Sequence, residues 1–196
     1  PSVSHAKAGA TVIANCSASD ETTGKDIYRR ELVSGQSARL VCAYIYSSAG
    51  EGESTQDIVF GGHNIICENG TILSEAKRYK NESIYADIDV SRIASERRRM
   101  TTFDTAHNDD YRVVGFKTVV EELELIRYFD KAPFVPSDMV TRNQRCEEIL
   151  DIQTYGLKKR LEHTNCKSAV IGISGGLDST LALLVTVRAF DLLGLD

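Results

Sequence analysis

The sequence feature that most constrains the fold is a glycine-rich turn near the end of the chain, set between two apolar segments. Residues 169–173 are AVIGI, the turn that follows is SGGLDST, and the chain continues as LALLVTVRAF. A compact aliphatic run is typical of a buried strand, and the longer apolar segment is typical of a buried helix. The pattern predicts one βα unit of a nucleotide-binding sheet.

The turn itself predicts a phosphate site. Gly175 and Gly176 let the backbone approach an anion closely, and hydroxyls and N–H groups at the following helix start supply donors near about half a positive charge. The turn is not a Walker A loop, because no Gly-Lys-Ser/Thr follows, and the spacing of Gly172, Gly175 and Gly176 is not G-x-G-x-x-G. A purely structural turn, with Ser179 as helix cap, is the alternative.

Residues 10–88 are predicted to form mostly strands. Runs of β-branched and aromatic residues favour strands at residues 10–15, 40–47, 64–67, 71–73 and 84–88. Asn69 and Gly70 predict a type I′ hairpin between the third and fourth strands, because both central positions of that turn need positive φ. The charged stretch 25–39, with interspersed aliphatic residues, predicts a helix.

The middle of the chain predicts a helix and then a linker. Residues 91–100 favour a helix in which Arg97, Arg98 and Arg99 form a solvated face, with an anion site as the alternative. Residues 101–140 have weak periodicity, a polar cluster at 107–110 and two of the three prolines, which is typical of a linker or covering segment. From about residue 141, apolar residues recur at the spacing of an amphipathic helix.

Composition excludes several classes of protein. The 196 residues suffice for one or two domains, and the 23 basic residues are outnumbered by 28 acidic ones, which argues against nucleic-acid binding. No apolar stretch approaches the roughly 20 residues that cross a bilayer, so no membrane contact is expected. The five cysteines include no CxxC pair, which excludes a disulfide framework or zinc site and favours a reducing cytoplasm. Cys16, Cys42 and Cys67 are expected to be small buried strand residues.

Two resemblances extend this interpretation. The SGGLDS turn resembles the pyrophosphate-binding loop of the ATP pyrophosphatase superfamily, whose members adenylate a carboxylate or carbonyl oxygen. Upstream, the segments ATVIANCSAS, YRRELVSGQSARLVCAYIYS and RRRMTTF are similar to the second half of the nitrilase-type glutaminase domain of glutamine-dependent NAD synthetases. The two resemblances occur in that family's domain order and cover nearly the whole chain.

The resemblance implies an α/β fold. The C-terminal half of a nitrilase-like αββα sandwich, residues 1–100, would precede a linker or covering segment at 101–140. Residues 141–196 would begin a Rossmann-like ATP pyrophosphatase domain with its first βα unit. The chain would then be an internal fragment, inactive alone, because the family's glutaminase Glu, Lys and Cys belong upstream of Pro1.

The resemblance also implies substrates and site residues. The activity would be that of a carbon–nitrogen ligase that uses ATP and Mg²⁺ to amidate deamido-NAD with ammonia from glutamine, in a homo-oligomer. Ser19 and Lys25 match glutamine-binding positions, although Ser19 could instead cap a turn and Lys25 could be a solvated charge. The residues that match the ATP loop are Gly172, Ile173, Ser174, Gly175, Gly176, Leu177, Asp178 and Ser179. Asp178 is also the candidate magnesium ligand.

Two other functions remain open at this point. One is a glutamine amidotransferase of the same superfamily with a different acceptor, such as a nucleotide base. The other is a non-catalytic nucleotide-binding or scaffold protein that keeps the loop without the glutaminase triad.

Overall fold

The computed structural model describes residues 1–54, 56–104, 111–119, 121–122 and 124–195, and it divides the chain into two compact units, Pro1–Tyr128 and Phe129–Asp196. The elements in chain order are α1 (Ser2–Lys7), β1 (Val12–Ser17), α2 (Lys25–Leu40), β2 (Ala43–Ser48), β3 (Ile65–Glu68), β4 (Thr71–Glu75), α3 (Val90–Arg99), α4 (Met139–Thr164) and α5 (Leu177–Leu193). The boundary between the units lies within the segment predicted as a linker. Part of that segment, including the polar cluster at 107–110, lies outside the described residues.

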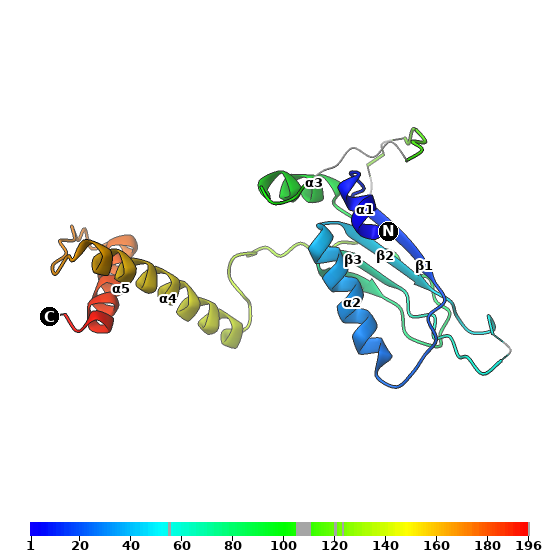
Figure 1. Cartoon of the computed structure of the whole chain (residues 1–196), viewed down its shortest axis with the longest axis horizontal. Coiled ribbons are helices and arrows are strands. Elements are labelled where there is room, and N and C mark those ends of the chain that lie inside the picture. Colours follow the sequence, from blue (N-terminus) through cyan, green and yellow to red (C-terminus); the bar gives the residue numbers. More distant parts are fainter. Residues whose placement is uncertain (55, 105–110, 120, 123, 196) are drawn as a thin grey trace. The chain divides into compact units, whose positions relative to one another are not determined.

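The described residues of the first unit form a mixed four-stranded sheet in the order β1-β2-β3-β4. β1 and β2 are parallel and are joined through α2, whereas β2-β3 and β3-β4 are antiparallel. Figure 1 shows α2 lying along one face of this sheet. The sequence prediction of these four strands and of the helix at 25–39 is confirmed, with ends that differ by at most three residues.

The predicted hairpin joins β3 to β4. Asn69 and Gly70 have φ values of +45° and +87°, so both central residues adopt the left-handed conformation that an Asn-Gly hairpin turn requires. Gly70 also has a packing reason to be glycine, because a Cβ atom there would lie 2.9 Å from the Cβ atom of Ala38 in α2. The turn thus packs directly against α2.

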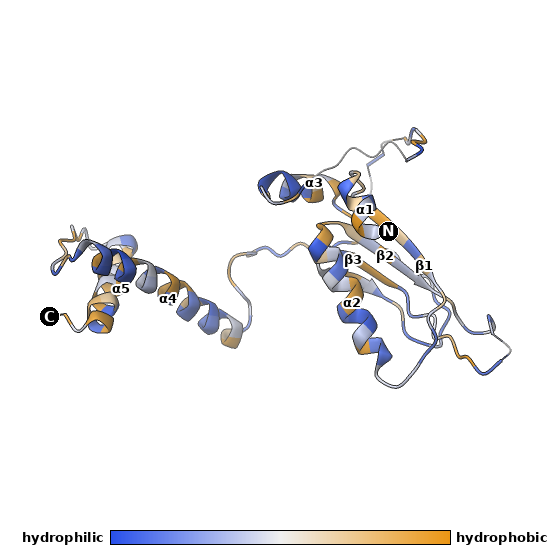
Figure 2. Ribbon diagram, in the orientation of Figure 1, coloured by the Kyte–Doolittle hydropathy of each residue, from blue (hydrophilic) through white to orange (hydrophobic). Residues whose placement is uncertain are grey.

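The core of this unit lies between α2 and the sheet. Ile13, Tyr44 and Cys67 are neighbours across three strands, and they face the same side as Val33 of α2. In Figure 2, α2 is mainly hydrophilic with isolated hydrophobic residues, as expected for a helix that buries one stripe. The buried core residues are Ala6, Ile13, Val33, Leu40, Cys42, Tyr44, Tyr46, Ile65 and Cys67.

One residue of α3 corrects the expectation of a solvated arginine face. Arg97 is partly buried and donates hydrogen bonds to the carbonyl oxygens of Val41 (2.8 Å), Ala10 (2.7 Å) and Leu40 (3.1 Å). Its guanidinium also lies 4.7 Å from the ring centroid of Phe103. Backbone carbonyls at the end of α2 need donors, and Arg97 supplies them. Arg98 and Arg99 are exposed, as predicted.

The predicted strand at residues 84–88 is wrong. These residues are irregular, and within the described residues they pair with no strand. Asp87 instead contacts the segment before the unit boundary: its carboxylate accepts from the N–H of Ile126 (2.7 Å), and its carbonyl accepts from Arg127 (3.3 Å). The β-propensity of IYADI is overridden because no neighbouring strand reaches it.

The second unit contains α4 and α5, which pack against each other. Leu161 of α4 and Val185 and Ala189 of α5 are buried, and Arg188 of α5 forms an ion pair with Glu147 of α4 (3.4 Å). Both predicted helices are confirmed. In the part of the chain that the structure describes, no helix combines the length and apolarity that a bilayer crossing needs.

Candidate functional site

The segment before α5 differs from its prediction. Residues 169–173, predicted as a buried strand, are irregular, with Val170 fully exposed and Ile173 55% exposed. A parallel strand needs neighbours in a sheet, and the described residues of this unit offer none. The predicted strand at residues 169–173 is therefore wrong, whereas the predicted turn and helix are present.

Hydrogen bonds among its own polar groups stabilise the glycine-rich turn. Gly175 has a φ of +83°, which favours glycine, and the N–H of Gly176 lies 3.4 Å from the hydroxyl of Ser174. The hydroxyls of Ser179 and Thr180 donate to the carbonyl of Gly176 at 3.0 and 2.9 Å. Three hydroxyls and the backbone N–H and carbonyl of Gly176 therefore meet at the start of α5.

The start of α5 has N–H groups available for an anion. Gly176 precedes the helix and has no side chain, so no side chain caps the first turn among the described residues. The N–H groups of the first turn of a helix have no intrahelical acceptor and carry its positive dipole end. Ser174, Gly175 and Gly176 are all exposed, so an anion can reach this position from solvent.

The residues around Asp178 provide too few ligands to bind Mg²⁺ on their own. Asp178 is exposed in the first turn of α5, and no group of three or more His, Cys, Asp or Glu side chains within the described residues could hold a metal ion. Magnesium commonly takes one or two carboxylates together with substrate phosphates and water. Asp178 fits such a shared role, and the described residues form no complete magnesium site by themselves.

The two predicted glutamine-binding residues lie on the connection from β1 to α2. Ser19 follows the last residue of β1 by two positions and is half-buried, and Lys25 is the first residue of α2. The Lys25 ammonium forms an ion pair with Asp20 at 2.6 Å, and this hydrogen bond lowers the pKa of the Asp20 carboxyl below its usual range. Lys25 is thus held beside the loop rather than extended freely into solvent.

Sequence reasoning missed a buried polar network beside this loop. Glu21 and Arg29 form an ion pair at 2.6 Å with both side chains 3% exposed, and Arg29 also contacts His63 at 3.1 Å. His63 in turn contacts Glu75 of β4 at 2.8 Å. Charged residues at helix spacing normally suggest solvent, so the sequence held no signal for this burial.

The two buried cysteines, Cys42 and Cys67, are poorly suited to act as nucleophiles. Cys42 and Cys67 are fully buried, and burial raises the pKa of each thiol to about 11. A thiol with a raised pKa is a poor nucleophile at neutral pH. Their predicted role as small core residues is confirmed, whereas the same expectation for Cys16 is wrong because Cys16 is exposed. Its position in an edge strand, on the face away from α2, accounts for this exposure.

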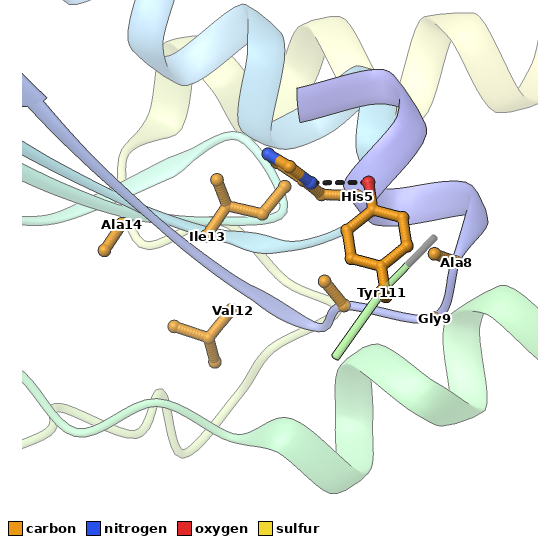
Figure 3. Close-up of a pocket in the computed structure, with 8 residues that line it drawn as sticks. His5, Ala8, Gly9, Val12, Ile13, Ala14 and Tyr111 are labelled. Carbon is orange, nitrogen blue, oxygen red and sulfur yellow. Dashed lines mark hydrogen bonds between the residues drawn. The ribbon is translucent and has the colours of Figure 1, made fainter. Parts of the chain in front are cut away.

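A separate pocket lies between α1 and β1 and contains none of the predicted site residues. It has a volume of about 440 Å³ and is lined mainly by small and aliphatic side chains. Figure 3 shows His5 and Tyr111 beside it, joined by a 2.7 Å hydrogen bond between Nδ1 and the phenol oxygen. The two rings meet edge to face, with centroids 5.5 Å apart. The residues that line this pocket include no Lys or Arg side chain.

Comparison with known proteins finds sequence similarity to one kind of enzyme over nearly the whole chain. The family model described as NAD synthase matches residues 149–195, which include the glycine-rich turn. The chain is 41% identical over 97% of its length to the glutamine-dependent NAD(+) synthetase of Mycobacterium tuberculosis strain H37Rv, and 43% identical over 97% to that of Mycobacterium leprae. It is 28% identical over 92% of its length to the Thermotoga maritima enzyme of the same name.

The chain spans about 30% of the length of these curated relatives. Among solved structures, it is similar to a glutamine-dependent NAD(+) synthetase from Cytophaga hutchinsonii, with 22% identity, a TM-score of 0.40 and coverage of 95% of this chain and 23% of that one. The enzyme of the same name from Acinetobacter baumannii, in complex with ADP, has 19% identity and a TM-score of 0.40, with coverage of 94% and 27%. By sequence, the chain is homologous to one segment of the glutamine-dependent NAD(+) synthetases.

Proposed function

We propose that the parent protein, encoded by the complete gene that contains this sequence, is a glutamine-dependent NAD(+) synthetase. It is a carbon–nitrogen ligase that uses ATP to amidate deamido-NAD and obtains ammonia from glutamine. The observation that carries this proposal is the uncapped start of α5 behind Gly175 and Gly176, within a chain 41–43% identical to enzymes of that name. The division into a nitrilase-like part and a Rossmann-like part belongs to the same proposal.

In this reaction the turn binds the ATP phosphates. A carboxylate oxygen of deamido-NAD attacks the α-phosphorus of ATP, and the bond to the β-phosphate oxygen breaks to release pyrophosphate. N–H groups at the start of α5, with the Ser174 hydroxyl nearby, stabilise the negative charge of the departing pyrophosphate. Mg²⁺ bound to these phosphates would neutralise further charge, and Asp178 could provide one of its ligands.

The loop between β1 and α2 contributes to the glutamine site. Lys25 can bind the α-carboxylate of glutamine in a charge-assisted contact, and the hydroxyl of Ser19 can hydrogen-bond the same substrate. Asp20 already accepts from Lys25 at 2.6 Å, so the substrate carboxylate competes with or joins this ion pair. Ammonia released from glutamine then attacks the adenylated carboxyl carbon, and AMP leaves.

Isotope transfer tests the function directly. The parent protein is given ATP and glutamine labelled with ¹⁵N in the side-chain amide, together with deamido-NAD and a nucleotide carrying an alternative acceptor base. We expect ¹⁵N in NAD, with AMP and pyrophosphate formed in equal amounts. Label in the other acceptor would identify a different amidotransferase, and ATP binding without any transfer would identify a nucleotide-binding scaffold.

A further inference from the structure

The connection from β1 to α2 is anchored by a buried ion pair that the proposed reaction does not use. Glu21 lies two residues after Ser19 and four before Lys25, and its carboxylate accepts from the guanidinium of Arg29, one turn into α2, at 2.6 Å. Both side chains are 3% exposed. The anchor thus lies inside the short segment that carries both candidate glutamine-binding residues.

Backbone contacts with residues 59–61 also fix this loop. The N–H of Glu21 donates to the carbonyl of Val59 at 2.7 Å, and Asp20 forms an isolated antiparallel bridge with Phe60. Gly61 lets this neighbouring segment approach closely, because a Cβ atom there would lie 2.5 Å from a carboxylate oxygen of Glu21. The loop therefore packs against residues 59–61 and is hydrogen-bonded to this segment.

The anchor continues into the sheet. Arg29 contacts Nδ1 of His63 at 3.1 Å, and Nε2 of His63 contacts Glu75 of β4 at 2.8 Å. Glu75 also accepts from Arg30 at 2.8 Å. Displacement of Glu21 would therefore disturb contacts that run from the loop through α2 to the edge strand β4.

Stability alone explains this pair poorly. Removing two charges from water costs free energy that a buried ion pair recovers only with complete hydrogen bonding, and an apolar pair of similar volume often does as well. Here Nε and Nη2 of Arg29 are buried without a hydrogen-bond partner among the described residues. A buried ion pair of this kind is better explained by a role in selecting one conformation of the chain. Here that is the conformation of the loop.

We propose that Glu21 and Arg29 are positioning residues that fix the β1–α2 loop and thereby place Ser19 and Lys25 for glutamine. This inference rests on the proposed function. Displacements of about 1 Å in a substrate-binding group can reduce a rate roughly a hundredfold. Loss of the pair should therefore impair the use of glutamine and spare the use of free ammonia, which does not need the glutamine site.

A second buried ion pair provides a matched control. Glu68 and Arg127 also meet at 2.6 Å, with side chains 4% and 13% exposed. Glu68 pairs with Ala43, which pairs with Val12 at the start of β1, whereas the loop follows the end of that strand. Glu68→Gln therefore removes a comparable buried charge at the opposite end of the sheet.

The test compares Glu21→Gln with Glu68→Gln in the parent protein. Glutamine-dependent and ammonia-dependent NAD synthesis are measured, together with amide hydrogen exchange of residues 18–25. We expect Glu21→Gln to raise the KM for glutamine at least tenfold, to leave the ammonia-dependent rate within twofold, and to speed exchange in the loop. Glu68→Gln should change the glutamine KM less than twofold, even if both variants lower the melting temperature equally.

Other outcomes would distinguish a failure of the positioning role from a failure of the proposed function. Equal glutamine KM values in the two variants, or loop exchange unchanged by Glu21→Gln, would overturn the positioning role. If Glu21→Gln does not fold, Arg29→Lys keeps the charge and loses the planar guanidinium, and it should give a smaller change in the same direction. A wild-type parent protein that makes NAD from ammonia but never hydrolyses glutamine would instead overturn the glutaminase half of the proposed function.

Discussion

Arg127 donates two hydrogen bonds to Glu68, at 2.7 Å to one carboxylate oxygen and 2.6 Å to the other. The first of these oxygens, Oε2, also accepts from the N–H of Asp89, the residue that caps α3. Glu68 is 4% exposed and lies at the end of β3. One buried carboxylate thus joins the sheet, the start of α3 and the segment that precedes the unit boundary.

This arrangement predicts a pH-dependent stability. The hydrogen bonds from Arg127 and Asp89 lower the pKa of Glu68 below its ordinary value of about 4.5 despite the opposing effect of burial. Between the folded and unfolded pKa values the unfolded state binds more protons, so protonation favours unfolding there. The contribution is complete above about pH 4.5 and is lost as pH falls through the folded value.

The variant Glu68→Gln lacks this titratable carboxylate, so it tests the predicted direction of the change in stability with pH. In thermal unfolding of the parent protein, the wild type should melt above the variant at pH 7, and the difference should narrow steadily below pH 4.5. Groups elsewhere titrate equally in both proteins and cancel in the difference. A constant difference between pH 7 and the lowest accessible pH would contradict the prediction.

Arg97 predicts a local loss of stability. Arg97→Gln removes charge-assisted hydrogen bonds to the carbonyls of Leu40, Val41 and Ala10, and we expect a cost of about 2–4 kcal/mol. Val41 has a φ of +44°, which is strained for a β-branched residue, so the end of α2 depends on such contacts. Hydrogen exchange of amides at the end of α2 measures the effect. Exposed Arg98→Gln is the control and should change the same exchange by less than about 0.5 kcal/mol.

The elements that sequence predicted well are those with a local cause. The Asn69-Gly70 hairpin follows from positive φ at two adjacent residues, and α2 follows from apolar spacing. The turn before α5 follows from adjacent glycines next to a long apolar helix. In each case the residues that decide the conformation are neighbours in the chain.

The elements that sequence missed depend on distant partners. Residues 84–88 and 169–173 have strand composition, yet strands form only where a neighbour lies alongside. Arg97 looked like a solvent-facing residue, but carbonyls 56 or more positions away determine its burial. The same holds for the pairing of Arg29 with His63, which are 34 positions apart. A pattern in one segment does not encode such contacts.

Substitution of Lys25 is expected to impair only the glutamine-dependent activity. Lys25→Ala in the parent protein should raise the KM for glutamine roughly tenfold or more, because a charge-assisted contact contributes about 1.5–3 kcal/mol. The ammonia-dependent rate should stay unchanged. Steady-state kinetics with each nitrogen source measure both quantities. Lys7→Ala, which breaks the exposed ion pair with Asp104 at 3.3 Å, is the matched control, and a glutamine KM equal in the two variants would exclude Lys25 from the site.

Substitutions of the two adjacent glycines in the turn are expected to abolish NAD synthesis for different reasons. Gly175 has a φ of +83°, so Gly175→Val distorts the turn itself. At Gly176 a Cβ atom would meet only the Ser174 hydroxyl, at an ordinary 3.5 Å, so Gly176→Val leaves the empty turn intact and occupies the space that a phosphate would approach. Both variants should lose ammonia-dependent and glutamine-dependent NAD synthesis.

Hydrogen exchange of the first turn of α5 distinguishes the two causes, because it should rise in Gly175→Val and stay at the wild-type level in Gly176→Val. Glutamine hydrolysis should persist in both, since the proposed glutamine-binding residues, Ser19 and Lys25, belong to the connection between β1 and α2 and not to this turn. Gly156→Ala, in the middle of α4 with open space at the Cβ position, is the control and should retain full synthesis. Wild-type rates of NAD synthesis in Gly176→Val would show that no phosphate approaches this backbone, and the assignment of the turn to ATP would then be wrong.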